Sequence, residues 1–194
     1  MQDNQQADAK RPDGNVSIRV AYPWSKSARH PREDARWTGI RKFAESCAAT
    51  AVAKEAKRSG IAVPATENWV DVARLRGMAG AFLSDVIFQR LACADILIAD
   101  ISGDNPNVML EVGAAIASGR VRVFLLKTQT GSEHPQPPSD LHGYFVTALP
   151  KTTDDDSDEL LKLLSADVSL RAALTGAIQA RLRERMPADP VDVP

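Results

Sequence analysis

The run at residues 95–100, DILIAD, constrains the fold more than any other part of the sequence because its middle is continuously apolar. A half-buried strand alternates apolar and polar residues, whereas a strand covered by helices on both faces is apolar throughout. The run therefore predicts a central strand of a parallel sheet, with an acidic residue at each of its ends.

Strands and helices alternate on both sides of this run. The alternation implies right-handed crossovers and an open, doubly wound parallel α/β sheet of about five strands with flavodoxin-like order. We expect further strands over 16–22, 61–66, 121–126 and 143–149, and helices over 35–58, 69–92 (broken near Gly77 and Gly80) and 106–118.

In a sheet of this kind ligands lie beyond the carboxyl ends of the strands. We therefore expect a site built from the loops after Tyr22, Thr66, Asp100 and Lys127. The loop over 127–142 would act as a lid that excludes water.

The length of 194 residues suits one α/β domain and is too short for two independent ones. We expect a C-terminal helix whose dipole is matched by the acidic run DDDSDE at its start and by Arg181, Arg183 and Arg185 at its end. The expected organisation is a disordered leader (1–15), the α/β domain (16–150), a C-terminal helical segment of the same domain (151–186) and a flexible tail (187–194).

Composition excludes several classes. The sequence has no apolar run of eighteen residues and no signal peptide, so we expect a cytoplasmic protein without a membrane role. The formal net charge of −1 indicates no broad binding of nucleic acid, although a basic loop over 26–36 is suited to a small anion or to solvent. Cys47 and Cys93 are expected to be buried free thiols, and neither they nor the three histidines have metal-ligand spacing, so we expect no metal and no cofactor.

The helix after the central strand has a clear start. Asn105 is suited to cap it, and Pro106 at the first helical position sacrifices no hydrogen bond. Glu111 then falls in the second turn, at the border of the apolar stripe. Because no Lys or Arg stands three or four residues away, a surface ion pair within the helix does not explain this glutamate.

A partly desolvated carboxylate at this position can act as a nucleophile or can stabilise an oxocarbenium ion at a glycosidic carbon. The alternative is that Glu111 only accepts hydrogen bonds from loop amides. Asp100, Asp104 and Asn105 could hold sugar hydroxyls or a base edge, and we place Asn107 with them as a ligand-binding candidate.

The run DILIADISGDNPNVMLEVGAAIASGR resembles the signature of the nucleoside 2-deoxyribosyltransferase-like superfamily, most closely its bacterial branch of TIR-like nucleotide-binding domains. The segment PPSDLHGYFV, residues 137–146, also resembles the family's proline-Asp-Leu segment, and the rest of the chain agrees in element order. The branch has a strand ending in Asp, an NPNV turn and an E-x-G-x-A helix, matched here by Asp100, Asn105, Pro106, Asn107, Val108, Glu111, Gly113 and Ala115.

This resemblance implies roles for individual residues. Glu111 would be the nucleophile that takes the sugar, and Tyr22 and Trp24 would line the base and sugar pocket. Asp85 stands nearest to the family's assisting acid, although its spacing differs. The alternatives are ordinary packing for the two aromatic residues and a solvated helix face for Asp85. The transferases themselves carry a glycine-rich turn where this chain has NPN.

Other nucleotide-associated folds lack their required residues in this sequence. A receiver domain needs acidic residues after the first strand for Mg²⁺, and a Rossmann or P-loop protein needs glycines there. The segment AYPWSKSARH has neither.

Two interpretations remain. In the first, the protein is an N-glycosidase or deoxyribosyltransferase acting on a nucleoside, nucleotide or NAD-like molecule. In the second, the same pocket binds a nucleotide without cleaving it, and the domain is a sensor or an oligomerising module, with a homo-oligomer as the assembly and bacterial defence signalling as the setting.

Overall fold

The computed structural model describes residues 15–22, 31–60, 69–75, 83–129, 141, 144, 146–149 and 156–185. Trp24, the expected strand over 61–66, residues 1–14 of the leader and the tail over 187–194 lie outside these ranges. The elements, in chain order, are β1 (Val16–Ala21), α1 (Pro31–Ser59), β2 (Val70–Arg74), α2 (Leu83–Ala92), β3 (Ile96–Asp100), the 3-10 turn η1 (Ser102–Asp104), α3 (Pro106–Ala117), β4 (Arg122–Thr128), β5 (Val146–Leu149), α4 (Ser157–Ala166) and α5 (Val168–Arg183).

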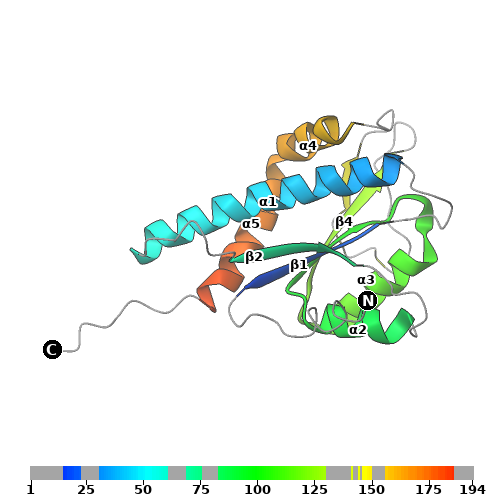
Figure 1. The fold of residues 1–194 in the computed structure, drawn as a ribbon, viewed down its shortest axis with the longest axis horizontal. Helices are drawn as coiled ribbons and strands as arrows, with labels where there is room; N and C mark the ends of the chain where they lie inside the picture. The colour runs from blue at the N-terminus through cyan, green and yellow to red at the C-terminus, as the bar shows by residue number, and fades with distance from the viewer. Residues whose placement is uncertain are drawn as a thin grey trace, which may run out of the picture.

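The five strands form one sheet with the order β2-β1-β3-β4-β5, and every pairing is parallel. Helices α1, α4 and α5 cover one face, and α2 and α3 cover the other (Figure 1). This arrangement confirms the predicted doubly wound, flavodoxin-like sheet.

The central strand β3 divides the hydrophobic core in two. All five of its residues are buried. Successive side chains of a strand point to opposite faces, so Ile96 and Ile98 pack in the cluster with α1 and α5, whereas Leu97 and Ala99 pack in the cluster with α2 and α3. The prediction from the apolar run is therefore confirmed.

The expected helix over 69–92 is wrong in its first part. Residues 70–74, VDVAR, form the edge strand β2, which pairs with β1 from Val16↔Val70 to Val20↔Arg74. Val70 and Val72 pack against the core on the α1 face, while Asp71 between them is exposed. This alternation has the period of a strand. Pairing with β2 also satisfies the backbone N–H and C=O groups on the outer side of β1, which a helix in place of β2 would leave unpaired. The helix α2 begins at Leu83.

The expected single C-terminal helix is also wrong, because it is two helices. Asp156 caps α4 by accepting hydrogen bonds from the backbone N–H groups of Asp158 and Glu159. Asp167 has an extended backbone conformation and caps α5 through the N–H of Leu170 at 2.9 Å. A side chain that satisfies the free amides of a new helix favours a break at its own position. The acidic residues thus begin α4, and Arg181 and Arg183 end α5.

The two thiols differ. Cys47 is buried within the α1 core, as predicted, but Cys93 is exposed. It stands in the turn directly after α2, where the chain leaves the core to enter β3. In the described ranges, no helix combines the length and the apolar composition needed to cross a bilayer.

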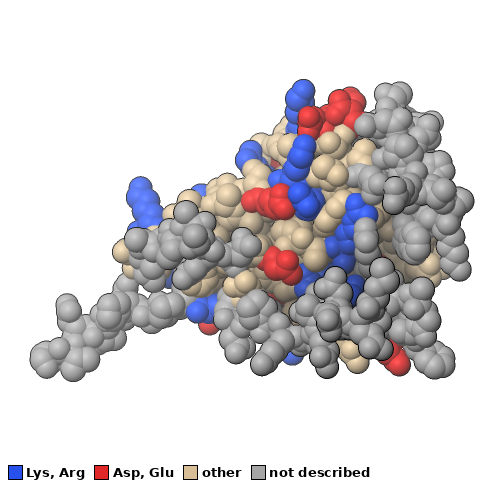
Figure 2. Space-filling view, in the orientation of Figure 1, with Lys and Arg blue, Asp and Glu red and all other residues tan. Residues whose placement is uncertain are grey.

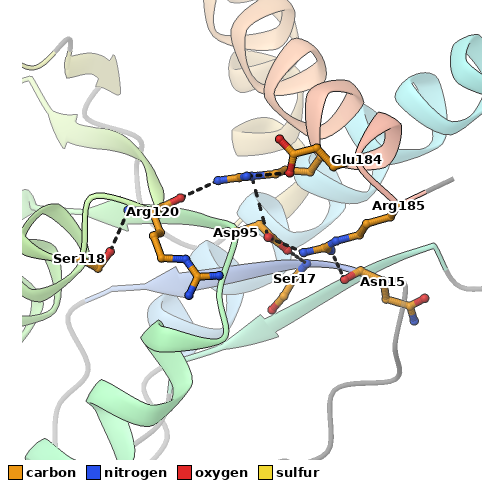
Figure 3. A network of polar contacts seen from close by, with 8 residues as sticks. Asn15, Ser17, Asp95, Ser118, Arg120, Glu184 and Arg185 are labelled. Atoms are coloured by element: carbon orange, nitrogen blue, oxygen red, sulfur yellow. Dashed lines mark hydrogen bonds and ion pairs between the residues drawn. The ribbon is translucent and has the colours of Figure 1, made fainter.

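A buried carboxylate joins the end of α5 to the amino edge of the sheet (Figure 3). Asp95 accepts a hydrogen bond from the Ser17 backbone N–H at 2.8 Å, and its other oxygen lies 2.6 Å from a guanidinium nitrogen of Arg185. Arg185 also donates to the backbone carbonyl of Asn15, and Arg181 lies 3.9 Å from the same Asp95 oxygen. These bonds connect the starts of β1 and β3 with the last turn of α5.

We predict that Asp95→Ala lowers the free energy of unfolding by about 3 kcal/mol, because removing one partner of a buried ion pair leaves the other uncompensated. Urea denaturation followed by circular dichroism would measure the change. Asp158→Ala, which removes an exposed partner of Lys42, is the matched control and should change stability little. Equal effects of the two substitutions would contradict the structural role of Asp95.

Candidate functional site at the carboxyl edge

The chain leaves β3 at Asp100 and enters α3 through a short turn. Asn105 caps α3, since its side-chain oxygen accepts hydrogen bonds from the backbone N–H groups of Asn107 at 3.0 Å and Val108 at 3.4 Å. Pro106 occupies the first helical position. The predicted helix start is therefore confirmed, and it fixes Glu111 in the second turn.

Glu111 is buried, with 7% of its surface exposed, on the side of α3 that also buries Val108, Val112 and Ala115. No hydrogen bond or ion pair connects its carboxyl group to any residue in the described ranges. The sequence prediction placed Glu111 at the border of the core, and the structure places it inside that border.

Three other acidic residues are buried in the described part of the chain, and each is paired. Glu55 lies 3.1 Å from Arg183, Asp95 pairs with Arg185, and Asp100 pairs with Arg36. Glu111 differs from all three because it is buried without a cation.

Burial raises the pKa of Glu111 from its ordinary value of 4.5 to about 7. Desolvation, which disfavours the charged form, is the cause, and no neighbouring charge offsets it. A carboxyl group with a raised pKa binds its proton more tightly in the folded protein. It therefore lowers stability progressively as the pH rises from about 4.5 to about 7, by roughly 3 kcal/mol in total.

Asp100 is fully buried and bonded on both oxygens. One guanidinium nitrogen of Arg36, on α1, lies 2.5 Å from one oxygen, and the Ser102 backbone N–H donates to the other at 3.0 Å. The sequence placed Arg36 where the basic loop over 26–36 meets the helix expected over 35–58; in the structure it lies on α1, and its charge is directed at Asp100 rather than left for an anion. A ligand-holding role for Asp100 stays a prediction.

The same guanidinium reaches β4. Its second nitrogen donates to the Thr128 hydroxyl at 2.8 Å, and that hydroxyl lies 2.9 Å from the Ser102 hydroxyl. The Thr128 backbone N–H donates to the Ser102 hydroxyl at 2.8 Å. Arg36 therefore joins the carboxyl ends of β3 and β4 to the first turns of α1. The sequence analysis did not identify Ser102 or Thr128 as site residues. Their positions, Ser102 in the turn after β3 and Thr128 at the end of β4, were the signal in the sequence that could have indicated them.

Tyr22, at the end of β1, faces other side chains. Its ring is nearly parallel to that of Trp37, with centroids 6.4 Å apart. The guanidinium carbon of Arg74 lies 4.8 Å from the Trp37 centroid and 5.6 Å from the Tyr22 centroid. This stack agrees with the packing alternative, and a pocket-lining role for Tyr22 stays a prediction. Arg74 and Trp37 were not predicted to lie here.

The remaining candidates are less enclosed. Asp85 is exposed in the first turn of α2, a helix that packs against α3. Asp104 is largely exposed, has a positive φ of 50° and pairs with Lys127 at 3.1 Å. Asn107 is exposed on α3. Asp100, Asp104 and Asn105 thus lie in or next to the turn that leads into α3, and Glu111 lies in the second turn of that helix, whereas Asp85 stands apart on α2.

Two further features bear on where a ligand could bind. A groove of about 620 Å³ lies between α1 and β2, and Trp69 and Val72 are among its lining residues; it is on the opposite face of the sheet from Glu111. Residues 130–140 of the predicted lid lie outside the described ranges. No group of three or more possible metal ligands occurs among the residues that the structure describes.

Comparison with known proteins adds no relative, because no protein-family model and no curated protein matches the sequence. The function is therefore argued from the geometry of the carboxyl edge.

We predict that Arg36→Met lowers the free energy of unfolding by about 3 kcal/mol, because it leaves the fully buried Asp100 carboxylate without its cation. Arg41→Met is the matched control on the same helix. Arg41 pairs with Glu45 at the surface, where such a pair contributes at most about 1 kcal/mol. Chemical denaturation of both variants would measure the difference, and a loss from Arg36→Met no larger than the loss from Arg41→Met would contradict this account.

Proposed function

We propose that the carboxyl edge binds a nucleoside, nucleotide or NAD-like molecule and that Glu111 acts on the anomeric carbon of its sugar. The observation that carries the proposal is the burial of Glu111, with no cation beside it among the described residues, on the helix that begins at the edge where doubly wound sheets bind ligands. A buried carboxyl group with a strongly raised pKa is costly to the fold, and such groups concentrate at functional sites.

The chemistry requires the ionised form of Glu111. A carboxylate oxygen forms a bond to the anomeric carbon while the bond from that carbon to the base nitrogen breaks and its electron pair leaves with the base. The base of a nucleoside or nucleotide then takes up a proton, whereas the nicotinamide of NAD leaves as the neutral base and needs none. Water then releases the sugar, or a second base does so in a transferase, and the carboxylate is regenerated. With a pKa of about 7, about half of Glu111 is ionised at neutral pH.

The resemblance to the nucleoside 2-deoxyribosyltransferase-like superfamily supports the same assignment. It selects Glu111 by its motif position, whereas the structure selects it by burial, and the two arguments are independent. Asn105 and Asp104 stand in the turn just before the helix that carries Glu111. They are the nearest candidates in sequence for contacts with sugar hydroxyls.

A second candidate function is binding without cleavage, as a nucleotide sensor. The observation that favours it is the absence of an acid partner for Glu111 among the described residues. Asp85 is exposed, and both oxygens of Asp100 are bonded within the protein. A leaving base would then take its proton from water or from residues outside the described ranges.

We predict that the purified protein releases free base from at least one member of a panel of nucleosides, deoxynucleoside monophosphates and NAD. Chromatography would follow the base. Glu111→Gln should lower the rate at least a hundredfold because the amide cannot attack, and Glu159→Gln, at an exposed position on α4, is the matched control. The wild-type rate should rise with pH through about 7, as the pKa of Glu111 requires.

Cleavage by Glu111→Gln at the wild-type rate would refute the role of this residue. Binding measured by calorimetry without cleavage by any variant would favour the sensor over the enzyme. If the wild type neither binds nor cleaves any member of the panel, both functions are refuted.

A further inference from the structure

The amino edge of the sheet, opposite to Glu111, gathers positive charge. The bonds around Asp95 place the end of α5 and the starts of β3 and β4 there, and the ion pair between Glu55 and Arg183 adds the end of α1. In Figure 1 the end of α5 lies beside the start of β1, and the end of α1 extends beyond the sheet on the same side. The cationic side chains of these segments, which we name the amino-edge basic surface, are Lys54, Lys57, Arg58, Arg120, Arg122, Arg181, Arg183 and Arg185.

The acidic residues of the same segments do not cancel this charge. Glu55 and Asp95 are buried and already paired with arginines. Glu184 is exposed and pairs with Arg181 at 2.8 Å. Among the described residues of these segments, eight positive and three negative side chains leave an excess of five positive charges, although the whole chain has a formal net charge of −1.

Four of the cations are available at the surface. Lys54 and Lys57 on α1, and Arg120 and Arg122 at the start of β4, are exposed. Their side chains make no hydrogen bond or ion pair with other residues in the described ranges. In Figure 3 the bonds of Arg120 run from its backbone, through its carbonyl to Arg181 and its N–H to Ser118, and its guanidinium carries none.

The described residues of this surface expose no large apolar side chain, and the apolar groove beside it lies between α1 and β2, lined by Val52, Ala53 and Trp69 among others. The large hydrophobic side chains that the described residues expose are Phe88, Leu110, Tyr144 and Val168, and none stands in the segments of the amino-edge basic surface. A docking site for a folded protein is usually centred on buried aromatic or aliphatic anchors, and a membrane-surface helix inserts an apolar face. A polyanion needs neither. Figure 2 shows Lys and Arg side chains on the face of the molecule that carries α1.

We propose that the amino-edge basic surface binds the phosphate backbone of a nucleic acid. Guanidinium groups match phosphate oxygens with paired hydrogen bonds, and two of the four available cations, Arg120 and Arg122, carry such a group. The strands β1, β3 and β4 are adjacent, so the surface is about 10 Å wide before the ends of α1 and α5 are added. A duplex carries one charge per roughly 1.7 Å of its axis, so a surface of this width meets several phosphates. The contact is with the backbone and is independent of base sequence.

The test is fluorescence anisotropy of the full-length protein with a labelled 20-base-pair duplex of mixed sequence, titrated at several salt concentrations. The wild type should bind at 50 mM salt, and the logarithm of its binding constant should fall linearly with the logarithm of salt concentration. The double variant Arg120→Glu/Arg122→Glu should bind at least tenfold more weakly and should lower the slope by about two.

The matched control is Lys162→Glu/Arg171→Glu, which makes the same change in net charge on the exposed faces of α4 and α5. Its affinity should stay within about threefold of the wild type, and Glu111→Gln should bind as the wild type does, which separates this proposal from the function of the carboxyl edge. No binding by the folded wild type, an equal loss from both double variants, or equally effective competition by polyglutamate would overturn the proposal.

Discussion

The burial of β3 on both faces is the constraint on which the rest of the structure depends. Its alternating side chains fill two separate core clusters, so helices must cover both sides of the sheet. Each connection therefore crosses a face and returns, and the strands run parallel. Their carboxyl ends meet at one edge, where Arg36, Asp100 and Thr128 form a bonded network beside the start of α3.

The buried carboxylates at the two edges of the sheet differ in whether a cation lies beside them. At the amino edge the carboxylate of Glu55 is matched by Arg183 of α5, and that of Asp95 by Arg185 in the turn just after α5. At the carboxyl edge Asp100 is matched by Arg36, whereas Glu111 is not matched by any described residue. The carboxylates paired with arginines contribute to the structure of the fold, whereas the carboxylate of Glu111 lowers the free energy of unfolding above pH 4.5. This contrast is the physical basis for assigning chemistry to Glu111.

The sequence predicted what depends on local pattern. The apolar run gave the central strand, Asn105 and Pro106 gave the start of α3, and the missing cations around Glu111 gave its isolation within the helix. The sequence misassigned β2 because VDVAR is short and its strand conformation depends on pairing with β1, a partner more than fifty residues away.

Contacts between distant elements were beyond prediction from the sequence. Arg36 was placed both at the end of the basic loop and in the first turn of the helix expected over 35–58, but nothing local shows that Asp100 lies within its reach. The break between α4 and α5 at Asp167 was missed because an acidic residue inside a charged segment is as compatible with a helix surface as with a cap. Cys93 was predicted to be buried because its sequence neighbours are apolar, but it lies in a turn at the surface and is exposed.

The central claim is that Glu111 is buried without a compensating charge, and its ionisation tests that claim most directly. Protein labelled with ¹³C at the glutamate carboxyl carbons would be titrated by NMR, and the Glu111 resonance would be assigned by its loss in Glu111→Gln. The account predicts a midpoint at about pH 7 for this resonance. A midpoint near the ordinary value of 4.5 would contradict it, because the carboxylate would then be hydrated or paired with a cation.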